Sequence, residues 1–205
     1  MGELLTSRGI KKAQEVEPIK NLKDIAKVKQ YLLGKDNKRD YMLFVVGINV
    51  GLRAGDLLSL KIKDVMTGSD INDVVRIQEE KTGKIREFVL NCSAKEAIEL
   101  YLKSLPEYDL NDYLFKSQKG GHITVQHAHS IIKTTMRDLN IKGNFGTHTL
   151  RKTFAYQTYV SNIKSNPGIL ETLQKILNHS SSAVTLRYIG ITKEVISDVY
   201  TNLNL

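Results

Sequence analysis

The sequence predicts a mixed fold, mainly α-helical with one small antiparallel β-sheet. Several stretches repeat apolar side chains at helical spacing, and most of them follow a polar residue that can cap a helix. Two short β-type segments, 74–77 and 85–90, flank a turn rich in lysine, which is typical of a β-hairpin. The chain has 205 residues, 41% of them hydrophobic, which is enough for one large or two small domains.

The charge balance favours a polyanionic partner. The chain holds 30 Lys and Arg against 22 Asp and Glu, a net charge of +8, and nucleic acid is the commonest partner of so basic a protein. A surface charge that serves only solubility is the alternative. The single cysteine, Cys92, excludes a disulfide framework and suits a reducing cytoplasm. No apolar run approaches the ~20 residues of a membrane span, so no membrane segment is expected.

The first quarter of the chain is expected to form a loose lead-in and two helices. Residues 1–20 are polar and unpatterned, so the folded domain is predicted to cover 21–205. Asn21 is placed to cap a helix that ends at Gly34. After a charged turn, a helix over 40–50 is apolar nearly all round, which predicts that it is the central buried helix.

An arginine follows this buried helix in an unusual setting. Arg53 lies between two glycines at the helix exit, where burial of a guanidinium without a partner is costly. Asp56, one helical turn on, is placed to hold it. The pair is either a structural contact that closes a helix corner or an arginine held rigid to bind an anion such as phosphate through its planar fork.

The middle of the chain carries the hairpin tip, a helix and a short extended piece. Lys81 and Lys84 lie at the tip, and taken alone they indicate a solvated turn. Ser93 and Glu96 are spaced as a capping box for the next helix. The apolar residues 113–115 predict a short extended piece.

A basic, glycine-containing loop leads into the following helix. Lys116 and Lys119 lie in the loop, and Thr124 is placed to cap a helix that runs to about Leu139. Such a loop at a helix start suits phosphate contacts. The nearby histidines suggest a metal site as the alternative, but two of them would point to different sides of the helix, and no carboxylate or cysteine completes a set. These histidines are His122, His127 and His129.

Two further segments carry side chains suited to oxyanion chemistry. His148 and Arg151 are three residues apart near a helix start, so they point to nearly the same side, where free helix N–H groups add donors. A capped helix with surface polar residues is the alternative. The next helix is expected to end at Asn178, and the serines after it restart a short amphipathic piece that bears Tyr188. This phenol is either core filler or a nucleophile.

Taken together, these segments resemble the catalytic domain of the tyrosine recombinases, the phage-integrase family. Four matching segments occur in the family's order and cover nearly the whole chain from about residue 20. They are Gly51-Leu52-Arg53 to Leu60, Lys81-Thr82-Gly83-Lys84, His148-Thr149-Leu150-Arg151, and Leu177-Asn178-His179 followed nine residues on by Tyr188. Lys152 stands where histidine is common, and Asn178 stands where glycine is common. Members of the family usually carry a separate N-terminal helical domain that clamps the other face of the DNA, and this chain is expected to depart from them in lacking it.

The resemblance implies site-specific DNA recombination at a site built around Tyr188. Tyr188 would attack a DNA phosphodiester, form a 3′-phosphotyrosine and release a 5′-hydroxyl strand end. Arg53 and Arg151 would clamp the non-bridging oxygens as charge builds in the transition state. Asp56 would orient Arg53.

The same resemblance assigns proton transfer and DNA contacts to the remaining residues. His148 and His179 would donate hydrogen bonds to the non-bridging oxygens, and His148 would also take the tyrosine proton. Lys81 would protonate the leaving oxygen. Further DNA contacts are expected from Lys84, Lys116, Lys119 and Lys152.

No cofactor and no metal are expected, since two arginines supply the positive charge. The implied partner is double-stranded DNA, on which a free monomer self-associates, into a tetramer in the synaptic complex. A final helix from Thr192 is expected to pack on its own domain in the free protein and on a neighbouring protomer on DNA. A cytoplasmic, nucleoid-associated protein of a bacterium or phage is expected. The alternatives are a catalytically silent DNA-binding regulator and a type IB topoisomerase-like enzyme that relaxes DNA.

Overall fold

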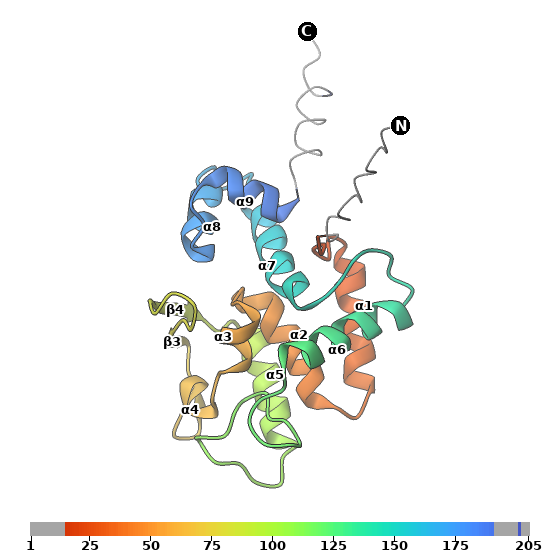
Figure 1. Cartoon of the computed structure of the whole chain (residues 1–205), viewed down its shortest axis with the longest axis vertical. Coiled ribbons are helices and arrows are strands. Elements are labelled where there is room, and N and C mark those ends of the chain that lie inside the picture. Colours follow the sequence, from red (N-terminus) through yellow and green to blue (C-terminus); the bar gives the residue numbers. More distant parts are fainter. Residues whose placement is uncertain (1–14, 191–200, 202–205) are drawn as a thin grey trace, which may run out of the picture.

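The structure of the protein, a computed structural model, describes residues 15–190 and 201 (Figure 1). It confirms the predicted fold class, because helices make up most of the described chain and the strands form two small antiparallel hairpins. The helices are α1 (Leu22–Gly34), α2 (Lys38–Val50), α3 (Ala54–Leu58), α4 (Ile62–Val65), α5 (Cys92–Lys103), α6 (Val125–Asp138), α7 (Thr147–Asn162), α8 (Ile169–Leu177) and α9 (Ser182–Ile189). The strands are β1 (Met66–Thr67), β2 (Asp70–Ile71), β3 (Val74–Gln78) and β4 (Ile85–Val89). In the described ranges, no helix has the length and apolar content that a membrane span needs.

Helix α2 is the centre of the main core. Its side chains over 42–46 are fully inaccessible to solvent, and α1, α5 and α7 pack around it. The prediction of a central buried helix is therefore confirmed. The helix begins two residues before the predicted start at Asp40, because the side chain of Asn37 caps it by accepting a hydrogen bond from the Asp40 N–H at 3.3 Å.

The start of α5 differs from the predicted one. The predicted capping box of Ser93 and Glu96 is wrong, because the helix already begins at Cys92. Asn91 is its cap, and the Asn91 side-chain oxygen accepts a hydrogen bond from the Ala94 N–H at 3.0 Å. Since asparagine caps a helix at least as well as serine, the earlier residue takes the role.

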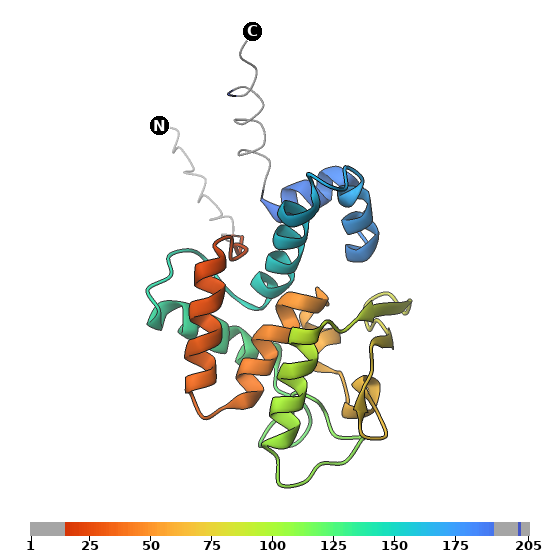
Figure 2. The same cartoon turned by 180° about the vertical axis from the view of Figure 1, so that it is seen from behind.

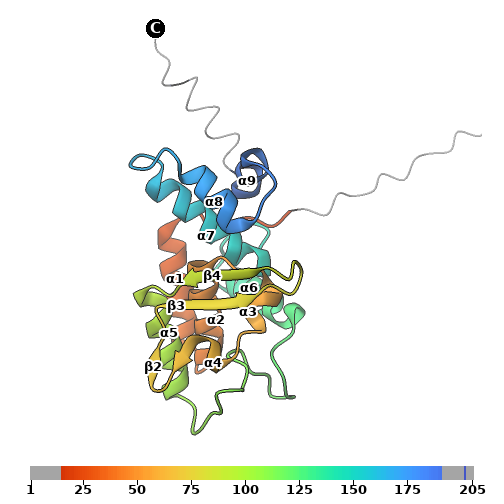
Figure 3. The ribbon, with the colours of Figure 1, turned by 90° about the vertical axis from the view of Figure 1, so that its left-hand side faces the viewer.

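The predicted hairpin of β3 and β4 is confirmed. The strands pair antiparallel with Val75 opposite Phe88, and both of these side chains are buried. Figure 3 shows the two strands crossing one side of the helical body, between α8 and α4. The extended piece expected at 113–115 forms only a single bridge, between Tyr113 and Lys61. A second hairpin, β1–β2, was not predicted, because strands of two residues leave no periodicity to detect.

Helices α8 and α9 form a smaller cluster at one end of the molecule, together with the second half of α7 (Figures 1 and 2). Its buried side chains come from all three helices and include Ala155, Leu173 and Ile189. The first half of α7 belongs to the main core through Leu150. Helix α7 is thus shared by both clusters and links them.

The chain before α1 is more ordered than the sequence predicts. Residues 15–20, expected to belong to the loose lead-in, include Ile19, which is only 2% exposed. The Ile19 N–H donates to the Thr153 hydroxyl at 2.9 Å, and Gln157 donates to the Ile19 carbonyl at 2.9 Å. One buried apolar side chain and its backbone bonds therefore move the start of the folded domain ahead of the predicted boundary. The predicted final helix from Thr192 lies outside the described residues, apart from residue 201.

The junction between α2 and α7 depends on glycine. Gly51 ends α2 in the left-handed region, with φ of +60°. A Cβ at this position would lie 2.3 Å from a ring carbon of Phe154 on α7. Earlier in α2, a Cβ on Gly47 would lie 2.6 Å from Leu150. Close approach of α2 and α7 therefore requires residues without a side chain at both positions.

We predict that Gly51→Ala destabilises the domain. The left-handed conformation costs an alanine about 1–2 kcal/mol, and overlap with the Phe154 ring adds a cost of about 1–3 kcal/mol. Thermal unfolding should show a midpoint lowered by about 5 °C or more. Gly34→Ala is the matched control, because a Cβ at Gly34 meets no atom within 4 Å. Equal midpoints for the two variants would contradict the prediction.

Candidate active site

Arg151 joins three parts of the chain at the base of the site. It lies in the second turn of α7 and is only 4% exposed. Its Nη1 donates to the carbonyl of Gly51 at 3.0 Å, and its Nη2 donates to the carbonyl of Leu177 at 2.8 Å. Burial is the main reason that the pKa of Arg151 falls to about 10, so the guanidinium stays charged at neutral pH. This charge is held between the ends of α2 and α8.

Arg53 has a nearer partner than the predicted one. Its Nη1 lies 2.8 Å from an oxygen of Glu79 but 3.8 Å from an oxygen of Asp56. Asp56 is buried and accepts a hydrogen bond from the Glu80 N–H at 3.0 Å. The predicted Arg53–Asp56 pair is present, but Asp56 mainly holds the backbone of the hairpin turn. Glu79 is the closer carboxylate of Arg53.

Glu79 was missed because it is distant from Arg53 in the sequence. The signal that could have found it is strand alternation: Val75, Ile77 and Glu79 are two residues apart, so all three point to the same face. That face is buried at Val75, and Glu79 is itself only 3% exposed. A carboxylate on the inner face of a strand requires a cationic partner.

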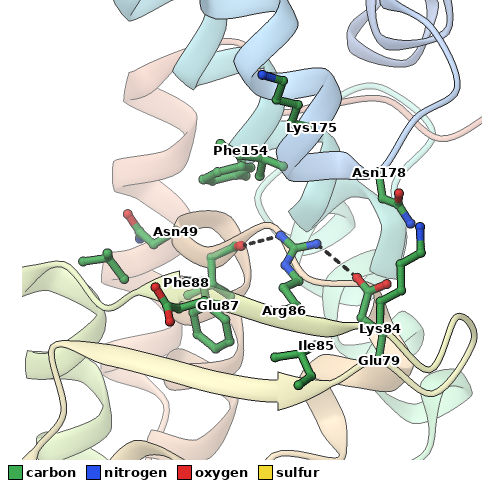
Figure 4. A pocket seen from close by; sticks show the side chains of 13 residues that line it. Asn49, Glu79, Lys84, Ile85, Arg86, Glu87, Phe88, Phe154, Lys175 and Asn178 are labelled. Carbon is green, nitrogen blue, oxygen red and sulfur yellow. Dashed lines mark hydrogen bonds and ion pairs between the residues drawn. The ribbon is translucent and has the colours of Figure 1, made fainter.

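Arg86 is a second arginine that the sequence analysis did not single out. Its Nη1 lies 3.4 Å from Glu79 (Figure 4). Its Nη2 donates to the carbonyls of Val50 and Gly51, each at 3.4 Å. Burial lowers the pKa of Arg86, and Glu79 opposes this effect. Burial also acts to raise the pKa of Glu79, but hydrogen bonds from Thr82 and the two arginines outweigh it, so that pKa is lowered. Glu79 is therefore an ionised carboxylate between two guanidinium groups.

A cleft opens beside this cluster. It has a volume of about 650 Å³ and lies between β4 and the C-terminal end of α8. Arg86, Phe154 and Asn178 contribute to its lining (Figure 4). The cluster of arginines and carboxylates is thus open to solvent on the side of the small helical cluster.

The Tyr188 side chain points into the site from α9. Its hydroxyl oxygen is buried and makes no hydrogen bond to any residue that the structure describes. Its ring packs edge-on against the ring of His179, with centroids 5.0 Å apart. Burial raises the pKa of Tyr188, while the neighbouring charge of Arg151 acts to lower it. The ring packs as a core residue does, but its hydroxyl lies unpaired beside an arginine.

The two predicted histidines both lie near Arg151, and His179 also contacts the tyrosine ring. The Nδ1 of His179 lies 3.1 Å from the hydroxyl of Thr185, and burial, then the charges of Arg151 and Arg53, lower its pKa. His148 is exposed in the first turn of α7. Partial loss of hydration, then the charges of Arg151 and Lys152, lower the pKa of His148. Both imidazoles are therefore held toward the neutral form, which can accept a proton.

The predicted lysines fall into different environments. Lys81 and Lys84 are exposed at the hairpin turn, and Lys119 is exposed in its loop. Lys116 is paired with Asp112 at 2.8 Å. A fifth lysine, Lys152, was expected to contact DNA, but it is only 5% exposed.

Lys152 is instead a neighbour of the tyrosine. Its Nζ lies 2.7 Å from an oxygen of Glu15 and 5.1 Å from the centroid of the Tyr188 ring. Helix α7 turns Lys152 toward α9 and the segment before α1. A contact of Lys152 with DNA therefore stays a prediction, and it would be made at Tyr188 rather than on the outer surface.

The assembled site can bind and attack an anion. Three guanidinium groups, Arg53, Arg86 and Arg151, face two carboxylates, so one positive charge is left for a ligand. A phosphodiester would meet donors that are already fixed, with a phenol beside them. Within the described residues, no three His, Cys, Asp or Glu side chains are grouped so that they could hold a metal ion.

Known proteins with similar sequences are integrases and tyrosine recombinases. The sequence profile of the phage integrase family matches residues 16–194. The chain is 42% identical over 186 residues to the probable integrase/recombinase YoeC of Bacillus subtilis, covering 90% of this chain and 95% of that protein. It is 29% identical over 171 residues to the tyrosine recombinase XerC of Caldanaerobacter subterraneus, covering 82% of this chain and 45% of XerC. The chain thus spans about half the length of the XerC relatives that it matches.

Solved structures share the fold. The XerA recombinase superposes with a TM-score of 0.70 at 22% identity, over 98% of this chain and 67% of that one. The XerH recombinase, in a post-cleavage complex with its difH substrate, superposes with a TM-score of 0.66 at 20% identity, over 94% of this chain and 55% of that one. These likenesses confirm the architecture of the domain.

The lowered pKa values of His148 and His179 predict that the domain loses stability as the pH falls. In the unfolded chain both imidazoles take up a proton near ~6.5, whereas in the folded chain they do so only at lower pH. Their contribution to stability is complete above ~6.5 and is lost as the pH falls through the folded pKa values. The midpoint of thermal unfolding should therefore be lower near pH 5.5 than near pH 7.5.

His179→Gln should reduce this pH dependence, because one of the two linked groups is removed. His127→Gln, at an exposed position of α6, is the control. The same difference in midpoint between the two pH values for both variants would refute the linkage.

Proposed function

The chain belongs to the phage integrase family of tyrosine recombinases, which are DNA breaking–rejoining enzymes, and from this premise we propose that it cleaves and rejoins double-stranded DNA through a covalent bond to Tyr188. The observation that carries the proposal is the buried hydroxyl of Tyr188 beside the charged guanidinium of Arg151. A tyrosine that only fills a core has no need of an arginine held next to its hydroxyl. The reaction is site-specific recombination.

The first step is attack of the Tyr188 oxygen on a DNA phosphorus. The P–O bond to the 5′ oxygen breaks, and the phosphate stays on the protein as a 3′-phosphotyrosine. His148 takes the phenolic proton, and the lowered pKa of its imidazole keeps it in the form that can accept one. Lys81, at the exposed hairpin turn, gives a proton to the leaving 5′ oxygen. Rejoining is the reverse reaction, with a 5′-hydroxyl as the nucleophile.

The arginines stabilise the transition state. Arg151 uses two donors for the carbonyls of Gly51 and Leu177, and a guanidinium has five. The remaining donors of Arg151, with those of Arg53, are available for the non-bridging oxygens of the phosphate. His179 adds a further donor. Because these groups are held before DNA arrives, little reorganisation is needed as negative charge builds.

Binding and assembly are proposed from charge and from the relatives. The excess of basic residues favours DNA, with exposed Lys84 and Lys119 placed to contact the backbone and Lys116 free to do so once it releases Asp112. The XerH structure is described as bound to its difH substrate, and a λ integrase structure as a dimer on a core site. We infer that this protein acts in a bacterial cytoplasm as a free monomer that associates on paired DNA sites, into a tetramer in the synaptic complex.

We predict that Tyr188→Phe abolishes covalent capture of DNA while DNA binding survives. Only the phenolic oxygen is lost, and the ring that packs against His179 is kept. A nicked suicide substrate should trap a protein–DNA adduct with the wild-type chain and none with Tyr188→Phe. Tyr159→Phe, in the same small helical cluster, should form the adduct normally. An undiminished adduct in Tyr188→Phe would end the assignment, and binding without any adduct in the wild type would favour a silent DNA-binding regulator.

We predict that Arg53→Lys and Arg151→Lys each lose most cleavage although the charge is kept. An ammonium cannot reproduce the planar fork, and loss of one oxyanion donor costs about 10²–10³ in rate. Single-turnover cleavage of the suicide substrate measures the loss. Arg76→Lys, an exposed arginine on β3 paired with Glu87, is the control. A near-normal cleavage rate for either lysine variant would show that this arginine has only a structural role. Cleavage by the wild-type chain should also persist in EDTA, because the proposed mechanism uses no metal ion.

A further inference from the structure

The turn that carries Lys81 is fastened on both sides of that residue. On one side, the N–H of Glu80 donates to Asp56 at 3.0 Å. On the other side, the hydroxyl of Thr82 donates to Glu79 at 2.7 Å. An exposed hairpin tip is usually mobile. Two hydrogen bonds donated to the buried carboxylates of Asp56 and Glu79 therefore restrict the position of the Lys81 backbone.

Glu79 is the common member of these contacts. The same oxygen, Oε2, lies 2.8 Å from the Arg53 Nη1 and accepts the bond from Thr82. The other oxygen, Oε1, lies 3.4 Å from Arg86. The Glu79 side chain is 4% exposed, whereas that of Arg53 is 24% exposed. The carboxylate is therefore the more deeply buried partner, and part of the Arg53 side chain reaches solvent.

We propose that Glu79 is a positioning residue that couples Arg53 to the turn bearing Lys81, with Thr82 as the link to that turn. This inference rests on the proposed function, in which Arg53 holds the phosphate and Lys81 protonates the leaving oxygen. One carboxylate oxygen sets the position of both groups, so the clamp and the acid approach the same phosphate in a fixed relation. Arg86 holds the other oxygen and stops the carboxylate from rotating away.

The chemistry of the leaving group separates the two roles of Glu79. A substrate with sulfur in place of the bridging 5′ oxygen releases a thiolate, which is a much weaker base than an alkoxide and leaves without a proton. Cleavage of this substrate does not need Lys81, but it still needs Arg53. A variant that only misplaces Lys81 should therefore cleave the sulfur substrate at the normal rate. A variant that disturbs phosphate binding by Arg53 should stay slow on both substrates.

Thr82 provides the sharpest test, because it is exposed and its replacement does not disturb the core. Thr82→Val keeps the shape of the side chain and loses the hydroxyl, whereas Thr82→Ser keeps the hydroxyl. Thr82→Val should cleave ordinary DNA about tenfold more slowly or worse, the size of effect that a hydrogen bond to a charged group supports. It should cleave the sulfur substrate at the wild-type rate. Thr82→Ser should resemble the wild type on both substrates.

Glu79→Gln tests the carboxylate itself. This variant should cleave ordinary DNA slowly. The sulfur substrate should restore only part of its cleavage rate, since Arg53 also loses its partner. Combined with Lys81→Ala on ordinary DNA, it should cost less than the product of the two single losses, because part of its effect acts through Lys81. Glu87→Gln, an exposed carboxylate on the same hairpin, is the control and should be normal. A cooperative thermal unfolding transition for each variant will check that the variant is folded.

The results separate failure of this inference from failure of the proposed function. If the wild type forms no adduct with either substrate, the proposed function fails. If the wild type cleaves both, the inference is overturned when Thr82→Val matches Thr82→Ser on ordinary DNA, or when its defect is not repaired by sulfur. The inference would also be overturned if the double variant Glu79→Gln, Lys81→Ala lost as much cleavage rate on ordinary DNA as the product of the two single losses.

Discussion

The buried guanidinium of Arg151 is the interaction on which the arrangement of the site depends. Its hydrogen bonds go to the carbonyls of Gly51 and Leu177, at the C-terminal ends of α2 and α8. Carbonyls at such ends lack partners within their own helices and carry the negative end of the helix dipole. Because a guanidinium is costly to bury without partners, this one side chain satisfies two helix ends and holds the small helical cluster, with its tyrosine, against the main core.

Both of these helices end in a left-handed residue, and the two ends tolerate different side chains. Gly51 has φ of +60° and the Phe154 ring against it, so the position excludes any side chain. Asn178 has φ of +52° and is exposed. Asparagine adopts this conformation more readily than other residues with a side chain, which explains why α8 can end here without a glycine.

The charge network fixes the arginines that we propose bind the phosphate. Arg53 and Arg86 would repel each other without Glu79 between them, and Arg86 shares the Gly51 carbonyl with Arg151. A continuous set of contacts therefore runs from the end of α8 to the hairpin turn. The phenol of Tyr188 adjoins one end of this set, and Lys81 adjoins the other. A single connected structure therefore positions the nucleophile and the acid that we propose.

Caps and periodicity were predictable from the chain because they act over one or two turns: Asn21, Thr124 and Asn178 lie where the sequence places them. The family motifs likewise predicted Arg53, Arg151 and Tyr188, and the structure brings these three together. Three features were decided by packing between distant segments: Glu79 as the partner of Arg53, Arg86 beside it, and the inward orientation of Lys152. These ion pairs form because one face of the β3–β4 hairpin packs against the C-terminal end of α2. That packing joins segments far apart in the sequence, so no local pattern along the chain predicts it.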